Sequence, residues 1–205
     1  MGHIEEPLNV RSRRTRAAAL DATWRLLEEE GPRRVTMAAV AERAGITRRA
    51  LYLHFPTRGE LLLALHRHVD EQLDLEGSLA PVLEAPDSET TIAEFSAHLA
   101  RYHFKISRID SALLGAADSD PEVAALLEHA SRVWHEGCRE LVGRLAREDR
   151  LAEPWTIETG ADLVWSFMFP ETLQRLTAQR NWSVEQYREL LTVLLSRTLL
   201  NGAGG

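Results

Sequence analysis

The stretch that decides the fold is TMAAVAERAGITRRALYLHF, which runs from Thr36 to Phe55. The hydroxyl of Thr36 can accept a hydrogen bond from an unpaired backbone N–H and so cap a short helix, which Gly45 ends. Thr47 offers a second cap two residues later, and the helix after it has Leu51 and Phe55 on its buried side. A helix, a glycine turn and a second helix predict a helix-turn-helix unit.

Helices are predicted on both sides of this stretch. Before it, apolar residues recur every three or four positions, which places on one helix face Ala17, Leu20, Trp24 and Leu27. Gly31 and Pro32 end this helix. An arginine-rich arm is expected ahead of it, with Arg11, Arg13, Arg14 and Arg16. After the stretch, Pro56 and Thr57 break the chain before a long helix over residues 58–75.

The remainder of the sequence is also predicted to be helical, because no convincing strand pattern appears in it. A loop is expected at residues 76–87, and helices at residues 91–108, 111–117, 121–148, 154–179 and 183–200. Pro170 predicts a kink or a break, and Ser183 with Gln186 has the spacing of a capping box. The predicted fold class is therefore all-α, with an N-terminal arm and three-helix domain at residues 1–57, a connecting helix at 58–75 and a larger helical domain at 76–205.

The net charge of −7 conceals an uneven distribution. The whole chain holds 24 basic and 31 acidic residues, an average that argues against nucleic acid as a partner. Residues 11–68, however, hold twelve arginines and only six acidic residues. This concentration favours a small DNA-binding module. The alternative, that the arginines only solvate helices, stays open, because the chain uses arginine throughout and Lys105 is its only lysine.

Cysteine content and hydropathy favour a cytoplasmic protein. Cys138 is the single cysteine, which excludes a disulfide-built scaffold. No apolar run approaches the length of a membrane span, and the first residues lack the apolar core of a signal peptide. We therefore expect no membrane partner.

The helix that begins after Thr47 is the candidate for reading DNA. If Leu51 faces the core, Arg48, Arg49 and Tyr52 turn outward, where each arginine can contact guanine or a phosphate. The hydroxyl groups of Thr36 and Thr47 also suit phosphate. The simpler interpretations are that the threonines only cap helices, that Arg48 only solvates its helix and that Tyr52 belongs to the core.

The Thr36–Phe55 stretch, with PTRGELL after it, resembles the DNA-binding signature of TetR-type transcriptional regulators. The resemblance implies that Tyr52 and His54 contact phosphates, that Tyr52 can also touch a thymine methyl group, and that Arg58 replaces a phosphate-binding lysine. Two positions depart from the family pattern. Leu53 stands where a polar or aromatic residue is common, which argues against a direct DNA contact there. Gly59 replaces an acid at the start of the helix that, in this family, transmits ligand binding.

The resemblance also implies a homodimer, built from the last two long helices. The final helix carries a broad apolar stripe, namely Tyr187, Leu190, Leu191, Leu194, Leu195, Thr198 and Leu199. A second apolar group precedes it, namely Leu163, Val164, Phe167 and Met168. Both groups can form a four-helix seam between two copies or, alternatively, an internal core.

A small-molecule pocket is expected in residues 76–205. Large apolar side chains with a few polar groups describe such a cavity, and the candidate ligand-binding residues are His98, Tyr102, Trp134, Trp165 and Phe169. Their character favours a hydrophobic or amphipathic effector. The alternative is that the same aromatic residues are ordinary core.

The competing function is a small-molecule-modifying or metal-binding helical enzyme. No nucleophile motif, phosphate loop or cofactor fingerprint is present. His135 with Cys138, and His66 with Asp70, have a spacing that could hold a metal, but neither pair has a second cluster. We therefore expect no enzyme activity, no cofactor and no metal. The favoured hypothesis is a homodimeric repressor that binds double-stranded operator DNA and is released by a small molecule.

Overall fold

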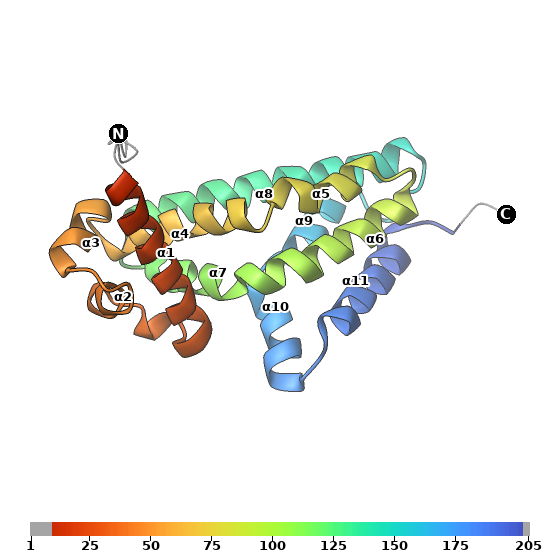
Figure 1. The fold of residues 1–205 in the computed structure, drawn as a ribbon. Coiled ribbons are helices and arrows are strands. Elements are labelled where there is room, and N and C mark those ends of the chain that lie inside the picture. Colours follow the sequence, from red (N-terminus) through yellow and green to blue (C-terminus); the bar gives the residue numbers. More distant parts are fainter. Residues whose placement is uncertain (1–9, 203–205) are drawn as a thin grey trace. The chain divides into compact units, whose positions relative to one another are not determined.

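The computed structural model describes residues 10–202, which form helices joined by short turns (Figure 1). These residues contain no strand, only an isolated antiparallel bridge between Leu151 and Leu200. The all-α prediction is therefore confirmed. The chain divides into two compact units. One holds the described residues up to Val69 together with Arg108–Ala125, and the other holds Asp70–Ser107 together with the described residues from Leu126 onward.

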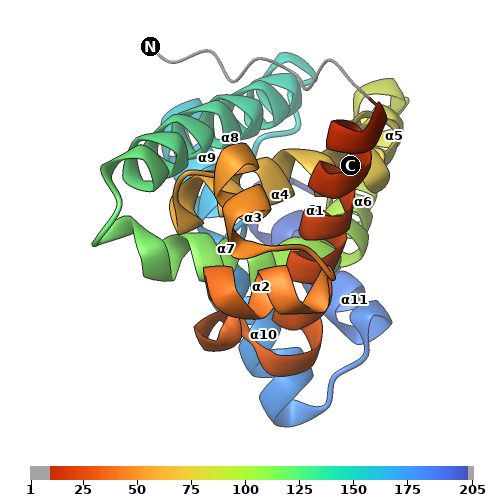
Figure 2. The same ribbon diagram turned by 60° about the vertical axis from the view of Figure 1, so that its left-hand side comes forward.

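The first unit contains the predicted helix-turn-helix. Its helices are α1 (Val10–Glu30), the short 3₁₀ turn η1 (Pro32–Arg34), α2 (Met37–Arg43), α3 (Arg48–His54) and the first part of α4 (Arg58–Gln72). Helices α1, α2 and α3 pack on one another (Figure 2). Their shared core contains Leu27, Leu51 and Phe55, each at most 1% exposed.

The caps and turns of this unit are those that the sequence indicates. Thr36 Oγ1 accepts from the backbone N–H of Ala39, and Thr47 Oγ1 accepts from that of Ala50, each over 3.1 Å. Gly45 has a φ of 65°, in the left-handed region that favours glycine. The prediction of an arginine-rich arm before the first helix is wrong for the residues that the structure describes, from Val10 onward. Helix α1 already begins at Val10, so Arg13, Arg14 and Arg16 are helical.

The first unit also contains a segment from later in the chain, a grouping that the sequence did not indicate. It comprises the end of α7 (Phe104–Ala117) and the start of α8 (Pro121–Arg147). Arg108 donates hydrogen bonds to the carbonyl oxygens of Leu27 and Glu28, at the last turn of α1. His66 Nε2 on α4 lies 3.6 Å from Asp110 Oδ1. These contacts join α7 to both α1 and α4.

The second unit contains α5 (Leu75–Glu84), α6 (Ser88–His98), the π-turn η2 (Leu99–His103), α9 (Ile157–Ser166), α10 (Pro170–Gln174), the π-turn η3 (Arg175–Gln179) and α11 (Val184–Leu199). Helices α5 and α6 lie side by side, and α11 packs on α6 (Figure 1). Residues 126–147 of α8 also belong to this unit. The core of the unit includes Ile92, Val142, Val164, Leu191 and Leu195.

Two predictions about this unit are corrected. Residues 76–87 are mostly helical: Asp74 caps α5, and Pro81 lies inside it. Packing of α5 on α6, which buries Val82, outweighs the hydrogen bond that proline cannot donate. No break separates 91–108 from 111–117, because α6, η2 and α7 follow one another without interruption.

The helices near the C-terminus follow the predicted start and stop signals with one shift. The helix expected from Pro154 begins at Ile157 instead, because Thr156 and Thr159 form a capping box there. Pro170 begins α10, so the alternative of a break is confirmed. The predicted capping box of Ser183 and Gln186 starts α11. Among residues 10–202, no helix combines the length and the apolar character that crossing a membrane requires.

Candidate nucleic-acid interface

Helix α3 presents one face to the core and the other to solvent. Leu51 is completely buried, whereas Arg48 and Arg49 are exposed and Tyr52 is 49% exposed. The interpretation of Tyr52 as a core residue is therefore wrong. An α-helix with exposed arginine and tyrosine side chains has the form and the chemistry that the DNA major groove admits.

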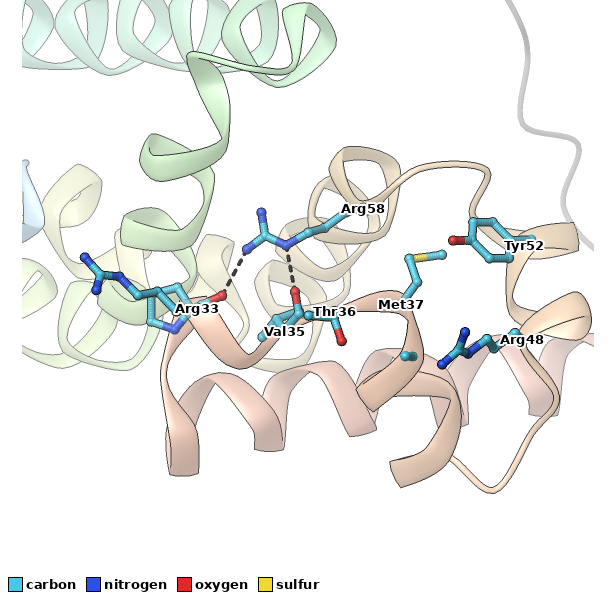
Figure 3. Close-up of a pocket in the computed structure, with 9 residues that line it drawn as sticks. Arg33, Val35, Thr36, Met37, Arg48, Tyr52 and Arg58 are labelled. Atoms are coloured by element: carbon cyan, nitrogen blue, oxygen red, sulfur yellow. Dashed lines mark hydrogen bonds between the residues drawn. The ribbon is translucent and has the colours of Figure 1, made fainter.

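A hollow of about 530 Å³ lies beside α3, between η1, α2 and the start of α4. In Figure 3 the guanidinium of Arg48 and the hydroxyl of Tyr52 point toward Met37 and Thr36. The hollow is lined by Pro32, Arg33, Val35, Thr36, Met37, Ala38, Arg48, Tyr52 and Arg58, with no acidic residue among them. It therefore offers a positively charged surface on which an anion can lie.

The distribution of ion pairs strengthens this positive surface. Arg34 pairs with Glu30 over 3.2 Å, and Arg43 pairs with Glu29 over 2.6 Å and with Glu30 over 2.9 Å. Glu29 and Glu30, at the end of α1, are thus paired with arginines that do not line the hollow. Within the described part of the chain, Arg48 and Arg58 have no acidic partner at ion-pair distance. Their charges remain available to phosphate.

Arg58 is held by backbone carbonyls. Its Nε donates to the carbonyl oxygen of Val35 over 2.7 Å, and its Nη2 donates to that of Pro32 over 3.0 Å (Figure 3). Burial lowers the pKa of the guanidinium below its usual value. The side chain therefore ties the start of α4 to the turn before α2. Its expected phosphate contact stays a prediction for its remaining N–H groups.

His54, the last residue of α3, is half-buried beside Phe55, with the two ring centroids 6.2 Å apart. Burial, and secondly the positive charge of Arg16, lower the pKa of His54 below its usual value. Arg16 itself lies over the Phe55 ring at 5.0 Å from the centroid. A neutral His54 can still donate one hydrogen bond to a phosphate, so that contact also stays a prediction.

The candidate ligand-binding residues fall into two clusters, both in the second unit. In the first, the ring centroids of His98 and Tyr102 are 5.4 Å apart, and His103 links them to Trp134 at 6.0 Å. His98 Nδ1 and Ser78 Oγ are 2.9 Å apart, and the hydroxyl of Tyr102 donates to Asp70. Burial, and secondly the positive charge of Arg101, lower the pKa of His98 to about 4.

The second cluster joins Trp165 and Phe169, whose ring centroids lie 4.9 Å apart. His135 stacks edge-on at 6.0 Å from Trp165 and is 2.8 Å from Asp162. Trp165 lines a hollow of about 380 Å³, and Tyr102 lines a smaller one of about 220 Å³. Within the described residues, the buried Nε1 of Trp165 has no hydrogen-bond partner.

Sequence reasoning missed Ser78 and Asp70 as members of the first cluster. The π-turn η2 contains more residues per turn than an α-helix. The side chains after His98 therefore point in directions that α-helical spacing does not predict.

The expected dimer seam divides into buried and exposed parts. Tyr187, Leu191, Leu195 and Leu199 are buried in the core of the second unit, which supports the alternative of an internal core for that face. Three neighbouring side chains on α11 face solvent instead: Leu190 at 36%, Leu194 at 37% and Val193 at 51% exposed.

The two residue pairs with metal-like spacing have other partners. Cys138 is buried with its Sγ 3.5 Å from Met168 Sδ, and burial raises the pKa of its thiol to about 12. Its neighbour His135 bonds to Asp162, and His66 faces Asp110. Across residues 10–202, no group of three or more His, Cys, Asp or Glu side chains is placed to hold a metal ion.

Comparison with known proteins finds a matching family model for part of the chain and solved structures with a similar fold. The sequence model of "Bacterial regulatory proteins, tetR family" matches residues 19–65. A probable HTH-type transcriptional regulator, ArpR of Pseudomonas putida, is 37% identical over a 75-residue alignment. The match covers 33% of this chain and 36% of that protein. The match thus spans about a third of the curated relative.

Two solved structures extend the similarity to nearly the whole chain, at the level of the fold. A putative transcriptional regulator from Saccharomonospora viridis, solved with choline, has a TM-score of 0.76 at 17% identity and covers 91% of this chain and 98% of its own. NalD, the secondary repressor of the MexAB-OprM multidrug efflux pump in Pseudomonas aeruginosa, has a TM-score of 0.69 at 21% identity, with 95% and 100% covered.

Proposed function

We propose, from the premise that this chain belongs to the tetR family of bacterial regulatory proteins, that it is a sequence-specific DNA-binding transcriptional regulator. The single observation that carries the proposal is the exposed face of α3, where Arg48, Arg49 and Tyr52 stand beside a hollow without acidic residues. The hollow and the capped start of α3 suit the phosphate backbone, and the outward arginines suit guanine edges.

The test is a titration of the full-length protein against DNA that flanks its own gene, followed by fluorescence anisotropy. We expect selective binding over a shuffled duplex at moderate salt, with affinity that falls steeply as salt rises. Equal affinity for both duplexes, or no binding at all, would overturn the proposal. Turnover of a small molecule without any DNA binding would favour the enzyme alternative.

The regulator is proposed to act as a homodimer. Leu190, Val193 and Leu194 form a solvent-exposed apolar stripe on α11, next to the buried face of the same helix. Two copies that bury this stripe would place two α3 helices on two half-sites, which multiplies their selectivity. Sedimentation measurements test the idea. Leu194→Glu should give a monomer, whereas Leu83→Glu, at a residue 79% exposed on α5, should remain dimeric.

The larger helical domain is proposed to bind a small hydrophobic or amphipathic effector that releases the repressor from its operator. Two features support it: the cluster of His98, Tyr102 and Trp134, and the buried, unpartnered Nε1 atom of Trp165. NalD is a repressor, and the Saccharomonospora regulator was solved with a small molecule. An effector shifts the equilibrium only through different affinities for the two states.

A small-molecule library tests this by thermal shift, followed by anisotropy on operator DNA. A compound that raises the melting temperature and lowers operator affinity is the expected result. Trp165→Phe should weaken that compound more than Trp182→Phe, because Trp182 lies outside both clusters. Compounds that bind and leave operator affinity unchanged would contradict release.

A further inference from the structure

Leu53 is the most solvent-exposed apolar side chain of α3. It is 78% exposed, whereas Leu51 on the opposite face of the same helix is completely buried. Singly exposed leucines are ordinary on protein surfaces. What distinguishes Leu53 is its position, one turn after the exposed Arg49 and next to Tyr52 on the face that the proposed function assigns to DNA.

We propose that Leu53 is a specificity-determining residue that covers the C5-methyl group of a thymine in the major groove. The inference rests on the proposed DNA binding and revises the expectation that Leu53 makes no direct DNA contact. Tyr52, the other candidate for a thymine methyl, is distinguished from Leu53 by the variants below. Leucine has no hydrogen-bond donor or acceptor, and the thymine methyl is the only apolar group on a base edge in that groove. Contact between the two removes both from water.

The surroundings of Leu53 favour DNA as the occupant over another protein. Arg48 and Arg49 lie on the same helix, and the adjoining hollow has no acidic residue among its lining side chains. A deoxyribose contact would also bury the leucine, but it would be independent of sequence. The thymine contact therefore makes a distinct prediction, namely dependence on one methyl group.

The experiment replaces each thymine of the selected operator in turn with deoxyuridine, which pairs identically and lacks only the methyl group. The wild-type protein should lose about three- to tenfold in affinity at one thymine of each half-site. Leu53→Ala should bind the thymine operator more weakly by a similar factor, and it should be insensitive to deoxyuridine at that position. This coupling identifies the two partners.

Two control variants separate the contact from other effects. Leu83→Ala removes a leucine of equal exposure from α5 and should keep both the affinity and the deoxyuridine penalty. Tyr52→Phe keeps an aromatic ring next to Leu53 and should also keep the deoxyuridine penalty. If the penalty disappears in Tyr52→Ala but persists in Leu53→Ala, the methyl group contacts Tyr52, and the inference is overturned. Because Leu53 is exposed, its alanine variant should retain the wild-type melting temperature.

The outcomes distinguish this inference from the proposed function. A flat deoxyuridine scan on an operator that is bound selectively overturns the role of Leu53 alone. Absence of selective binding to any duplex overturns the proposed function and this inference together. A penalty of equal size in the wild type and in Leu53→Ala also rejects the contact.

Discussion

The Nε of Arg58, the first residue of α4, donates a 2.7 Å hydrogen bond to the carbonyl oxygen of Val35, the residue before the cap of α2. A second bond from the same guanidinium reaches Pro32. One side chain thus fixes the turn that positions Thr36, while its charge, without an acidic partner, still faces the hollow.

Replacement of Arg58 should therefore change both stability and DNA binding. Arg58→Met keeps the apolar stem and removes the donors, so the carbonyls of Pro32 and Val35 lose their partners, and unfolding in urea should become easier by about 1–3 kcal/mol. Loss of a phosphate-facing charge should weaken binding to all sequences and reduce the salt slope by about one. In the control, Arg34→Met, both quantities should change little. An unchanged salt slope would show that Arg58 serves only the turn.

Arg49 should contribute selectivity in place of general affinity. It is exposed on α3 and has no acidic partner among the described residues. Arg49→Ala is expected to lower the ratio of operator to shuffled-DNA affinity by about 10- to 100-fold, since a guanine contact contributes about 1–3 kcal/mol of discrimination. Competition binding at fixed salt measures the ratio. Arg43→Ala is the matched control, because that guanidinium is bound to Glu29 and Glu30. An equal loss on both duplexes would assign Arg49 to phosphate.

Gly59 is predicted to be sensitive to an added side chain. A Cβ built on it would clash with the carboxylate of Asp120 and would lie 3.0 Å from a methyl carbon of Val123. Gly59→Ala must therefore push the Asp120 carboxylate aside and tighten the contact with Val123, and it should lower both the melting temperature and operator affinity. Asp120→Ala removes the obstructing carboxylate.

The double variant Gly59→Ala/Asp120→Ala should recover most of the lost melting temperature, although Asp120→Ala alone costs its weak cap on Val123. Thermal melts of all four proteins complete the cycle. If the double variant is no more stable than Gly59→Ala, the clash with Asp120 is not what limits this position.

The sequence predicted those features that depend on local chemistry. Thr36, Thr47 and Ser183 cap their helices because a hydroxyl next to free N–H groups acts within three residues. Gly59 looked like an unexplained departure, since its reason is Asp120, which lies 61 positions later in the chain. The packing of residues 108–125, the end of α7 and the start of α8, within the first unit is equally non-local, so periodicity carries no information about it.

The candidate sites also divide into features that follow from local sequence and features that depend on contacts distant in the sequence. The exposed face of α3 follows from the burial of Leu51, which the pattern indicates directly. The partners of Arg58 and the ring cluster around His98 depend on a turn and a π-turn whose geometry no α-helical spacing describes. Sequence reasoning left open whether the stripe of α11 forms a seam or an internal core, and burial assigns Leu191 and Leu195 to the core.

His98 should make the protein less stable in mild acid. Its pKa in the folded protein is about 4, because burial and the positive charge of Arg101 disfavour the imidazolium, whereas an unfolded histidine titrates near 6.5. Between these values the unfolded state binds a proton that the folded state does not, so stability falls as the pH falls. The loss is absent above about pH 7 and complete below about pH 4, and it amounts to about 2 kcal/mol between pH 7 and pH 5.

Urea denaturation of the wild type and of His98→Gln at these two pH values isolates this contribution. The glutamine can keep a hydrogen bond to Ser78 and does not titrate, so the variant should lose about 2 kcal/mol less than the wild type on acidification. His129→Gln, at an exposed histidine on α8, should show the full wild-type loss. Parallel pH curves for His98→Gln and the wild type would mean that the imidazole of His98 already accepts a proton in the folded protein. In that case the cluster with Tyr102 and Trp134 would have to be open to water.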